Sequence, residues 1–214
     1  MLRRSASLTL LAVVLAALAA ACGTTSTTSG SPTTTEGSSA IASAPATTAP
    51  AQLFASDFEG SCQGATVSSA TAYDPAAASH KILLFTSYED SLVEDSLTLP
   101  ADWQVTFEAD GNAYAAIELV ACALRTEEAF VQDCTGYESD GVVTENVAKL
   151  HNATYELTVR EATTGTALGS TTIATAEDEC PMFVTFEGEQ DTVDYFAPPP
   201  DDQVTAFLKP FVQP

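Results

Sequence analysis

The sequence predicts a mostly-β domain over residues 53–214, and three observations lead to this fold class. Residues 155–160 alternate apolar and polar side chains, which places them on opposite faces of a strand. β-branched and aromatic residues are dense along the whole segment. Turn-forming residues recur at about every tenth position, a spacing typical of an antiparallel β-sandwich of the immunoglobulin-like or a related type.

The chain begins with the pattern of a secretory signal peptide. Arg3 and Arg4 precede a run from Leu8 to Ala21, fourteen residues that are apolar apart from Thr9. This run is too short to cross a bilayer, which takes about 20 apolar residues. A positive start, a short apolar middle and small residues before a break predict that residues 1–21 form a signal peptide that is removed.

The break at Leu18-Ala19-Ala20-Ala21-Cys22 resembles the lipobox of bacterial lipoproteins. In that family one aliphatic and two small residues precede an invariant cysteine; here Ala19 stands where Leu is usual. The resemblance implies that Cys22 carries the lipid (fatty acyl chains such as palmitate) and holds the protein on the outer face of the cell membrane. The alternative is an ordinary signal peptide cut after Ala-x-Ala, with Cys22 an incidental thiol.

A low-complexity linker follows the cysteine, so that residues 22–52 comprise Cys22 and a disordered spacer. Residues 23–51 are almost entirely Gly, Ser, Thr, Ala and Pro, with Glu36 the single charge and Ile41 the single large apolar residue. Such a segment buries too little apolar surface to offset its ordering entropy. A flexible coil of this length spans about 30 Å.

The folded part is expected to contain several short strands and two helical stretches. The predicted strands are residues 81–87, 103–109, 114–124, 128–137, 141–147, 155–160, 168–174 and 180–188. The pair Thr164-Gly165 predicts a turn before the strand at 168–174. Residues 74–81 are expected to form one or two helical turns. Residues 201–212 place apolar side chains at helical spacing, and Pro210 is expected to end this helix near Lys209.

Four cysteines in the folded part predict two disulfides. Cys62, Cys122, Cys134 and Cys180 form an even set in an exported chain. Three pairings are possible. Because residues 114–124 and 128–137 are predicted as strands with a break near Glu128, a hairpin there favours Cys122–Cys134, which leaves Cys62–Cys180.

The charge balance excludes some partners. With residues 1–21 removed, five basic and 29 acidic residues remain, a net charge of −24. Nucleic-acid binding is excluded as a function because phosphate contacts need Lys and Arg. Electrostatic attachment to anionic lipid is disfavoured for the same reason. So acidic a surface is typical of a soluble, monomeric domain.

The sequence identifies no catalytic residue, no metal site and no cofactor. His80 and His151 lie in no hydrolase or metal motif; His80 is expected to cap or pack, and His151 to be exposed in a polar turn. Calcium could bind one of two acidic runs, although neither matches the EF-hand loop. The candidates are Glu108, Asp110 and Asn112 in one run and Glu89, Asp90, Glu94 and Asp95 in the other. Trp103, Phe107 and Tyr114 are expected in the core.

Seven segments loosely resemble a domain of uncharacterised exported bacterial proteins, a resemblance that implies no activity. They are residues 62–65, 79–85, 99–103, 118–124, 133–137, 155–168 and 178–181. The sequence therefore favours a lipid-anchored binding or scaffolding module at the cell envelope, with a protein or glycan ligand. Two alternatives stay open: an envelope hydrolase that uses carboxylates in a polar cleft, and a calcium-dependent adhesion module.

Overall fold

A computed structural model describes residues 52–109, 111–188 and 190–214. The predicted signal peptide, Cys22 and the linker up to residue 51 lie outside these residues. Within the described part, no helix is both long and apolar enough to cross a membrane.

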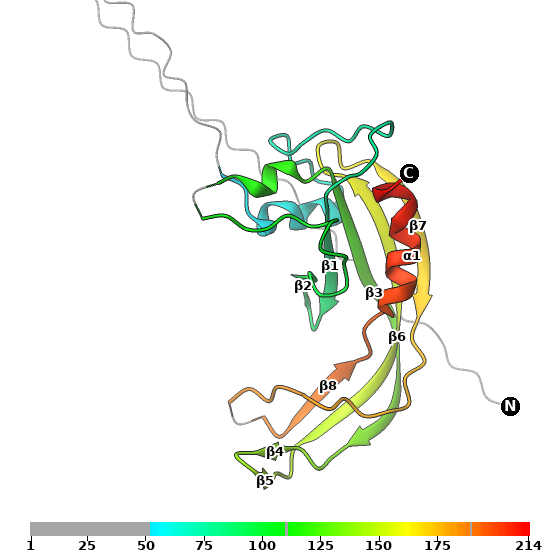
Figure 1. Cartoon of the computed structure of the whole chain (residues 1–214). Helices are drawn as coiled ribbons and strands as arrows, with labels where there is room; N and C mark the ends of the chain where they lie inside the picture. Colours follow the sequence, from blue (N-terminus) through cyan, green and yellow to red (C-terminus); the bar gives the residue numbers. More distant parts are fainter. Residues whose placement is uncertain (1–51, 110, 189) are drawn as a thin grey trace, which may run out of the picture. The chain divides into compact units, whose positions relative to one another are not determined.

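One mixed six-stranded sheet dominates the described residues (Figure 1). Its strand order is β2-β1-β3-β6-β7, and β8 also pairs with β6. The bounds are β1 (Ile82–Tyr88), β2 (Ser91–Glu94), β3 (Leu119–Cys134), β6 (Val147–Glu161), β7 (Ala167–Ala174) and β8 (Thr192–Phe196). The mostly-β prediction and the C-terminal helix are confirmed. A fully antiparallel sandwich is not what the strands form, because β1 runs parallel to β3 and β8 runs parallel to β6.

The two parallel pairs arise from the connections between the strands. The 95–118 segment carries the chain from β2 back to the start of β3 and contains the 3-10 helix η2 (Ala113–Ala116). Residues 103–109, predicted as a strand, lie in this connection and pair with no strand. Residues 180–188, also predicted as a strand, lie in the connection between β7 and β8 and likewise pair with no strand. The remaining elements are the 3-10 helix η1 (Ala55–Gln63), the ribbon β4 (Glu138–Ser139) and β5 (Val142–Val143), and α1 (Asp201–Val212).

The long antiparallel ladder of β3 and β6 forms the spine of the sheet. It runs from Leu119 opposite Glu161 to Cys134 opposite Ala148, with irregularities between Arg125 and Glu127 and between Phe130 and Gln132. β1 and β7 flank one end of the ladder and β8 flanks the other. We call these ends the β1 half and the β8 half; they lie at the top and bottom of Figure 1.

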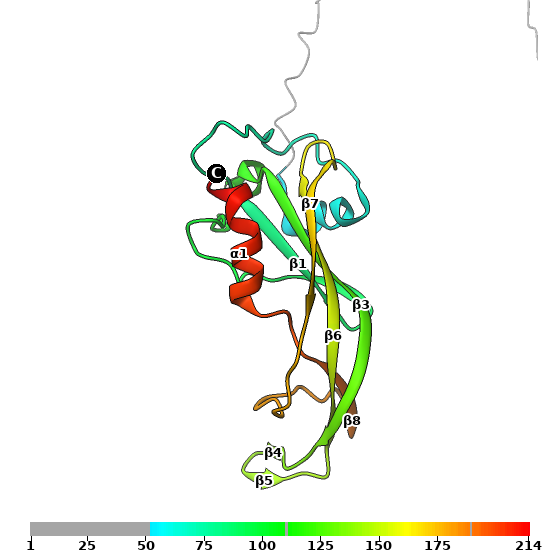
Figure 2. The ribbon, with the colours of Figure 1, turned by 90° about the vertical axis from the view of Figure 1, so that its right-hand side faces the viewer.

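The two faces of the β1 half have separate cores. One core packs Val204, Leu208 and Val212 of α1 onto buried sheet residues such as Leu157. The other packs Phe58 of η1 onto the opposite face. Figure 2 shows α1 lying along one face of the sheet. Within the described residues, helices and loops rather than a second sheet therefore cover this half.

Helix α1 extends beyond the point at which its sequence predicts an end. It contains Pro210 and continues to Val212. Proline removes one hydrogen bond of the helix, and its ring crowds the carbonyl four residues earlier, which together cost about 3 kcal/mol. Val212 is fully buried, and this packing offsets the lost bond. By contrast, the helical turns predicted at 74–81 are irregular turns and bends.

Two disulfides form among the four cysteines, as predicted, but the favoured pairing of Cys122 with Cys134 and of Cys62 with Cys180 is wrong. The bonds join Cys62 to Cys122 and Cys134 to Cys180. The hairpin expected near Glu128 does not form, because residues 119–134 are one continuous strand. Cys122 and Cys134 consequently lie far apart along β3. The first bond ties η1 to the β1 half, and the second ties the segment before β8 to the end of β3.

Gly165 is expected to tolerate no side chain. Its φ is +69°, and an added Cβ would lie 2.3 Å from the carbonyl oxygen of Gly64. We expect Gly165→Ala to lower the free energy of unfolding by about 2 kcal/mol or more, since the left-handed conformation alone costs about 1–2 kcal/mol. The matched control is Gly141→Ala, where φ is +77° and no atom lies within 4 Å. Urea denaturation should show the larger loss for Gly165→Ala; equal losses would contradict the close approach.

Candidate functional site

A cleft lies between the free end of the β1–β2 hairpin and strand β8. Its volume is about 690 Å³, within the range of about 300–1,000 Å³ that is usual for ligand sites. One wall consists of residues 86–89 and 93–97, and the opposite wall of residues 183–185, Glu187, Gln190, residues 193–196 and Pro198. Arg125 of β3 and Tyr155 of β6 lie between these walls. In Figure 1 the hairpin lies above β8, the two being on the two halves of the β3–β6 ladder.

Both walls of the cleft present large apolar side chains to solvent. On the hairpin wall, Tyr88 is 57%, Val93 40% and Leu97 95% exposed. On the β8 wall, Phe183 is 86% exposed. Single exposed apolar residues are ordinary, but a set gathered around one cleft marks an interaction site.

Arg125 connects the two walls. Its guanidinium lies over the ring of Phe196, 3.4 Å from the centroid, and its Nη2 donates to the carbonyl of Glu89 at 3.1 Å. The backbone N–H of Arg125 donates to Ser87 Oγ. The side chain is only 15% exposed, and Nη1 is buried without a hydrogen-bond partner among the described residues. Arg125 thereby contacts both the hairpin turn and β8 and stabilises their relative position.

Arg125→Met is expected to loosen the cleft. The variant keeps a long apolar stem but loses the hydrogen bond to Glu89 and the stacking on Phe196. A desolvated cation–π contact contributes about 2 kcal/mol, and a hydrogen bond to a charged group about 1.5–3 kcal/mol. Part of this loss is offset, because the variant no longer buries Nη1 without a hydrogen-bond partner. We expect a fall of about 1–3 kcal/mol in the free energy of unfolding, measured in urea. Lys149→Met, at an exposed position of β6, should be nearly neutral; a similarly neutral Arg125→Met would contradict the bridging role.

Tyr155 forms the most enclosed part of the cleft. Its hydroxyl donates to the carbonyl of Ala197 at 3.0 Å. Burial raises the pKa of Tyr155, and the nearby Arg125 opposes part of that rise. Burial likewise raises the pKa of Tyr195 in the β8 wall. Because the folded state favours both neutral hydroxyls, their contribution to stability persists below the ordinary tyrosine pKa of about 10 and is lost as pH rises through the raised values.

The rim of the cleft is acidic. Glu89, Glu94, Glu187 and Asp194 line it and are all exposed. Asp194 accepts from His151 Nε2 at 2.9 Å. The half-buried Asp95 has both carboxylate oxygens engaged, one by the N–H groups of residues 97 and 98 and the other by the Thr98 hydroxyl. Arg125 is the single basic residue among the described residues that line the cleft.

Two edge strands border the cleft. β2 pairs with β1 alone, and β8 pairs with β6 alone, among the described residues. Val93 and Glu94 of β2 and residues 193–196 of β8 line the cleft. Each strand therefore leaves one edge of its backbone without strand pairing, and such edges are templates for another extended chain.

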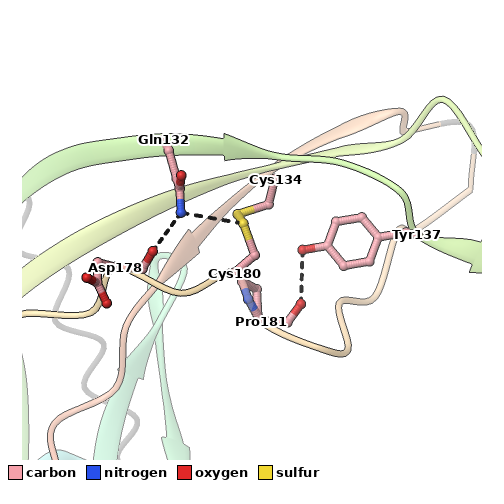
Figure 3. The surroundings of a disulfide bond; sticks show 6 residues. All are labelled: Gln132, Cys134, Tyr137, Asp178, Cys180 and Pro181. Atoms are coloured by element: carbon pink, nitrogen blue, oxygen red, sulfur yellow. Dashed lines mark hydrogen bonds between the residues drawn. A yellow bond between two sulfur atoms is a disulfide. The ribbon is translucent and has the colours of Figure 1, made fainter.

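The Cys134–Cys180 disulfide anchors the segment that forms one wall (Figure 3). Gln132 Nε2 donates to the carbonyl of Asp178 at 2.8 Å, and Tyr137 Oη donates to the carbonyl of Pro181 at 3.2 Å. Val184 and Phe186 pack with buried Leu150 in a third core cluster. The exposed Phe183 is thus held on a fixed backbone.

The histidines do not join the cleft lining. His80 is buried, as its packing role predicts, with Nδ1 3.0 Å from Glu118 Oε2 and its ring against Tyr73. The prediction of an exposed His151 in a turn is wrong: it lies in β6 between Phe130 and Phe196, and its side chain is 14% exposed.

The candidate calcium ligands form no metal site among the described residues. In the described part of the chain, which lacks Asp110, no three His, Cys, Asp or Glu side chains are close enough to hold a metal ion. Glu89, Glu94 and Asp95 from the second candidate calcium run lie on the cleft wall. Trp103 is buried as predicted, whereas Phe107 is 55% exposed and not in the core.

A second hollow lies beyond the first, in the β8 half. Its volume is about 860 Å³, and it is lined mainly by residues 135–139, which include β4, and by residues 180–184. It shares Phe183, Val184 and Gln190 with the first cleft. These three residues therefore border both hollows, and the first hollow is the one that contains the enclosed Tyr155 and Arg125.

Comparison of the chain with family models, curated proteins and solved structures finds no match.

Proposed function

We propose that this protein is a lipid-anchored binding module on the outer face of the cell membrane, and that the cleft between β2 and β8 is its binding site. The observation that carries the binding role is the exposure of large apolar side chains on both walls of one cleft. Their exposure leaves apolar surface in water that a ligand would cover.

The proposed location is supported by sequence and disulfides together. The segment before Cys22 has the order of a lipoprotein signal, and the two disulfides are typical of an oxidising space outside the cytosol. A lipid on Cys22 and the linker of residues 23–51 would together tether the cleft outside the membrane.

The geometry favours binding over the carboxylate hydrolase. A catalytic acid of that kind needs an enclosed carboxyl whose pKa is raised by its surroundings. Here the rim residues Glu89, Glu94 and Glu187 are exposed, and the less exposed Asp95 uses both oxygens to hold its own loop. The enclosed groups are a tyrosine and an arginine, which suit recognition.

Site-specific photo-crosslinking in producing cells tests the binding role. The photoreactive p-benzoylphenylalanine would replace Leu97 on one wall and, in a second strain, Thr185 on the other. We expect both positions to give an adduct with the same envelope component, identified by mass spectrometry. Adding Phe183→Ser should remove the Leu97 adduct, because it removes apolar surface across the cleft.

The matched control places the same probe at Phe130, which is 57% exposed and lies outside the cleft. It should not give the adduct. Failure of both wall positions to react, or the same adduct from Phe130, would contradict the proposal.

A further inference from the structure

We infer that the ligand of this cleft is an extended, basic segment of another protein that adds to the edge of β2 or β8 as a further strand. The inference rests on the proposed function and names the partner class. It combines three observations: the charge of the rim, the two edge strands, and the aromatic side chains between them.

The rim selects for positive charge. Glu89, Glu94 and Glu187 are exposed on the cleft, and their side chains make no salt bridge among the described residues. Arg125, the one basic side chain among the described lining residues, already donates to Glu89 O and stacks on Phe196. The whole chain carries 29 acidic and seven basic residues, so its field favours a basic partner and repels an acidic one.

The edge strands select for an extended backbone. A strand that pairs on one side only offers its remaining N–H and C=O groups to a peptide, which then binds as an added strand. The free edge of β3 beyond Arg125 is a poorer template, because two register shifts interrupt it and Glu127 and Glu128 stand side by side on it. The edges that border the cleft are therefore the better sites.

The side chains of the walls suit alternating basic and apolar residues. Lys and Arg can lay their aliphatic stems along Tyr88 and Phe183 while their charged ends reach the rim carboxylates. Intervening apolar residues would cover Leu97 and Val93, which are otherwise exposed. A second copy of the same chain fits poorly, because each copy brings the same excess of negative charge.

Fluorescence anisotropy of the full-length chain with three nine-residue peptide pools tests the inference. The pools share Leu, Val and Phe at alternate positions and carry Lys and Arg, Glu and Asp, or Ser and Gln at the others. We expect the basic pool alone to bind, with an affinity that falls at least tenfold between low and high salt. Salt weakens the attraction because it screens exposed charges beyond about 10 Å at 0.1 M.

A charge-matched pair of variants locates the site. Glu89→Gln/Glu94→Gln/Glu187→Gln should weaken binding about tenfold, since each exposed ion pair is worth about 0.2–1 kcal/mol. Glu59→Gln/Glu145→Gln/Glu156→Gln removes the same charge from exposed positions outside the cleft and should weaken binding no more than about twofold. Circular dichroism and urea unfolding would establish that both variants fold like the original.

Backbone methylation tests the strand-like mode. In the tightest-binding basic peptide, N-methylation at alternate residues should abolish binding for one set of positions and spare it for the other, because alternate N–H groups of an added strand point at the protein. Equal effects of the two sets would overturn strand addition.

Other results would overturn the choice of partner. Equal weakening by both triple variants would mean general attraction to an acidic surface. Binding of the neutral pool as tightly as the basic pool would rule out charge selection. Dimers in sedimentation that Leu97→Glu dissolves would make a second copy the occupant. A crosslink from Leu97 and Thr185 with no affinity for the basic pool would keep the proposed function and overturn this inference.

Discussion

Replacing Cys62 and Cys122 together by alanine is expected to lower the free energy of unfolding by about 4 kcal/mol. In the chain-entropy account, a disulfide limits the unfolded state, and a separation of 60 residues corresponds to about 4 kcal/mol. Such a loss is a large part of the total stability of a domain, about 5–15 kcal/mol. The turn η1 would also lose its covalent bond to β3, and with it the close packing of Phe58.

Urea unfolding of the oxidised proteins measures this effect, and a second double variant controls it. Cys134→Ala/Cys180→Ala removes the other disulfide, which joins residues 46 positions apart. Its free energy of unfolding should fall by a similar amount. The Cys134→Ala/Cys180→Ala variant should also make residues 181–188 more mobile and weaken ligand binding at the cleft. The Cys62→Ala/Cys122→Ala variant should leave ligand binding intact. Unfolding of Cys62→Ala/Cys122→Ala at the wild-type urea concentration would show that this bond does not hold the β1 half together.

Replacing Cys22 by serine is expected to abolish fatty-acyl labelling completely. The thioether to the lipid needs the sulfur of Cys22, and a serine hydroxyl does not replace it in the proposed modification. Cells fed an alkyne analogue of palmitate should label the wild-type chain and not Cys22→Ser, as read by in-gel fluorescence after click coupling. Because each buried CH₂ contributes about 0.8 kcal/mol, loss of the acyl chains removes the attachment they provide.

Ser26→Ala, four residues further on, is the matched control and should label like the wild type. Equal labelling of Cys22→Ser, or an unlabelled wild-type chain that still begins at Met1, would contradict lipid attachment at Cys22.

The local patterns of the sequence predict local structure well. The alternation at 155–160 lies within β6, and Thr164-Gly165 forms the predicted turn before β7. The apolar stripe of residues 201–212 forms α1 and buries Val204 and Leu208. In each case neighbouring residues carry the information, because strand and helix periodicity depend on positions only two to four apart.

The pairing of the cysteines depends on the length of strand β3, and this length cannot be predicted from the sequence. The polar residues 125–128 suggest a turn, yet β3 continues through them with a register shift between Arg125 and Glu127. A bulge absorbs the irregularity while the chain stays extended. Polar, exposed strand residues and a turn look alike in sequence, so the hairpin that favoured Cys122–Cys134 was predicted where no turn exists.

The cleft could not be predicted for a related reason. Its lining comes from β1, β2, β3, β6 and β8 and from the loops after β2 and before β8, and only long-range pairing brings them together. Arg125 and Phe196 are 71 positions apart in sequence yet in contact. The excess of acidic residues does point to a basic partner, but their position on one rim emerges only in the fold.

Hydrogen–deuterium exchange of the full-length chain, with and without the tightest-binding basic peptide, tests most directly whether this cleft is the binding site. The expected result is slower exchange at β2 (residues 91–94) or β8 (residues 192–196), or at both, with no change at the outer edge strand β7. Slower exchange at β7 alone, or no difference at β2 and β8 while the peptide is bound, would contradict it.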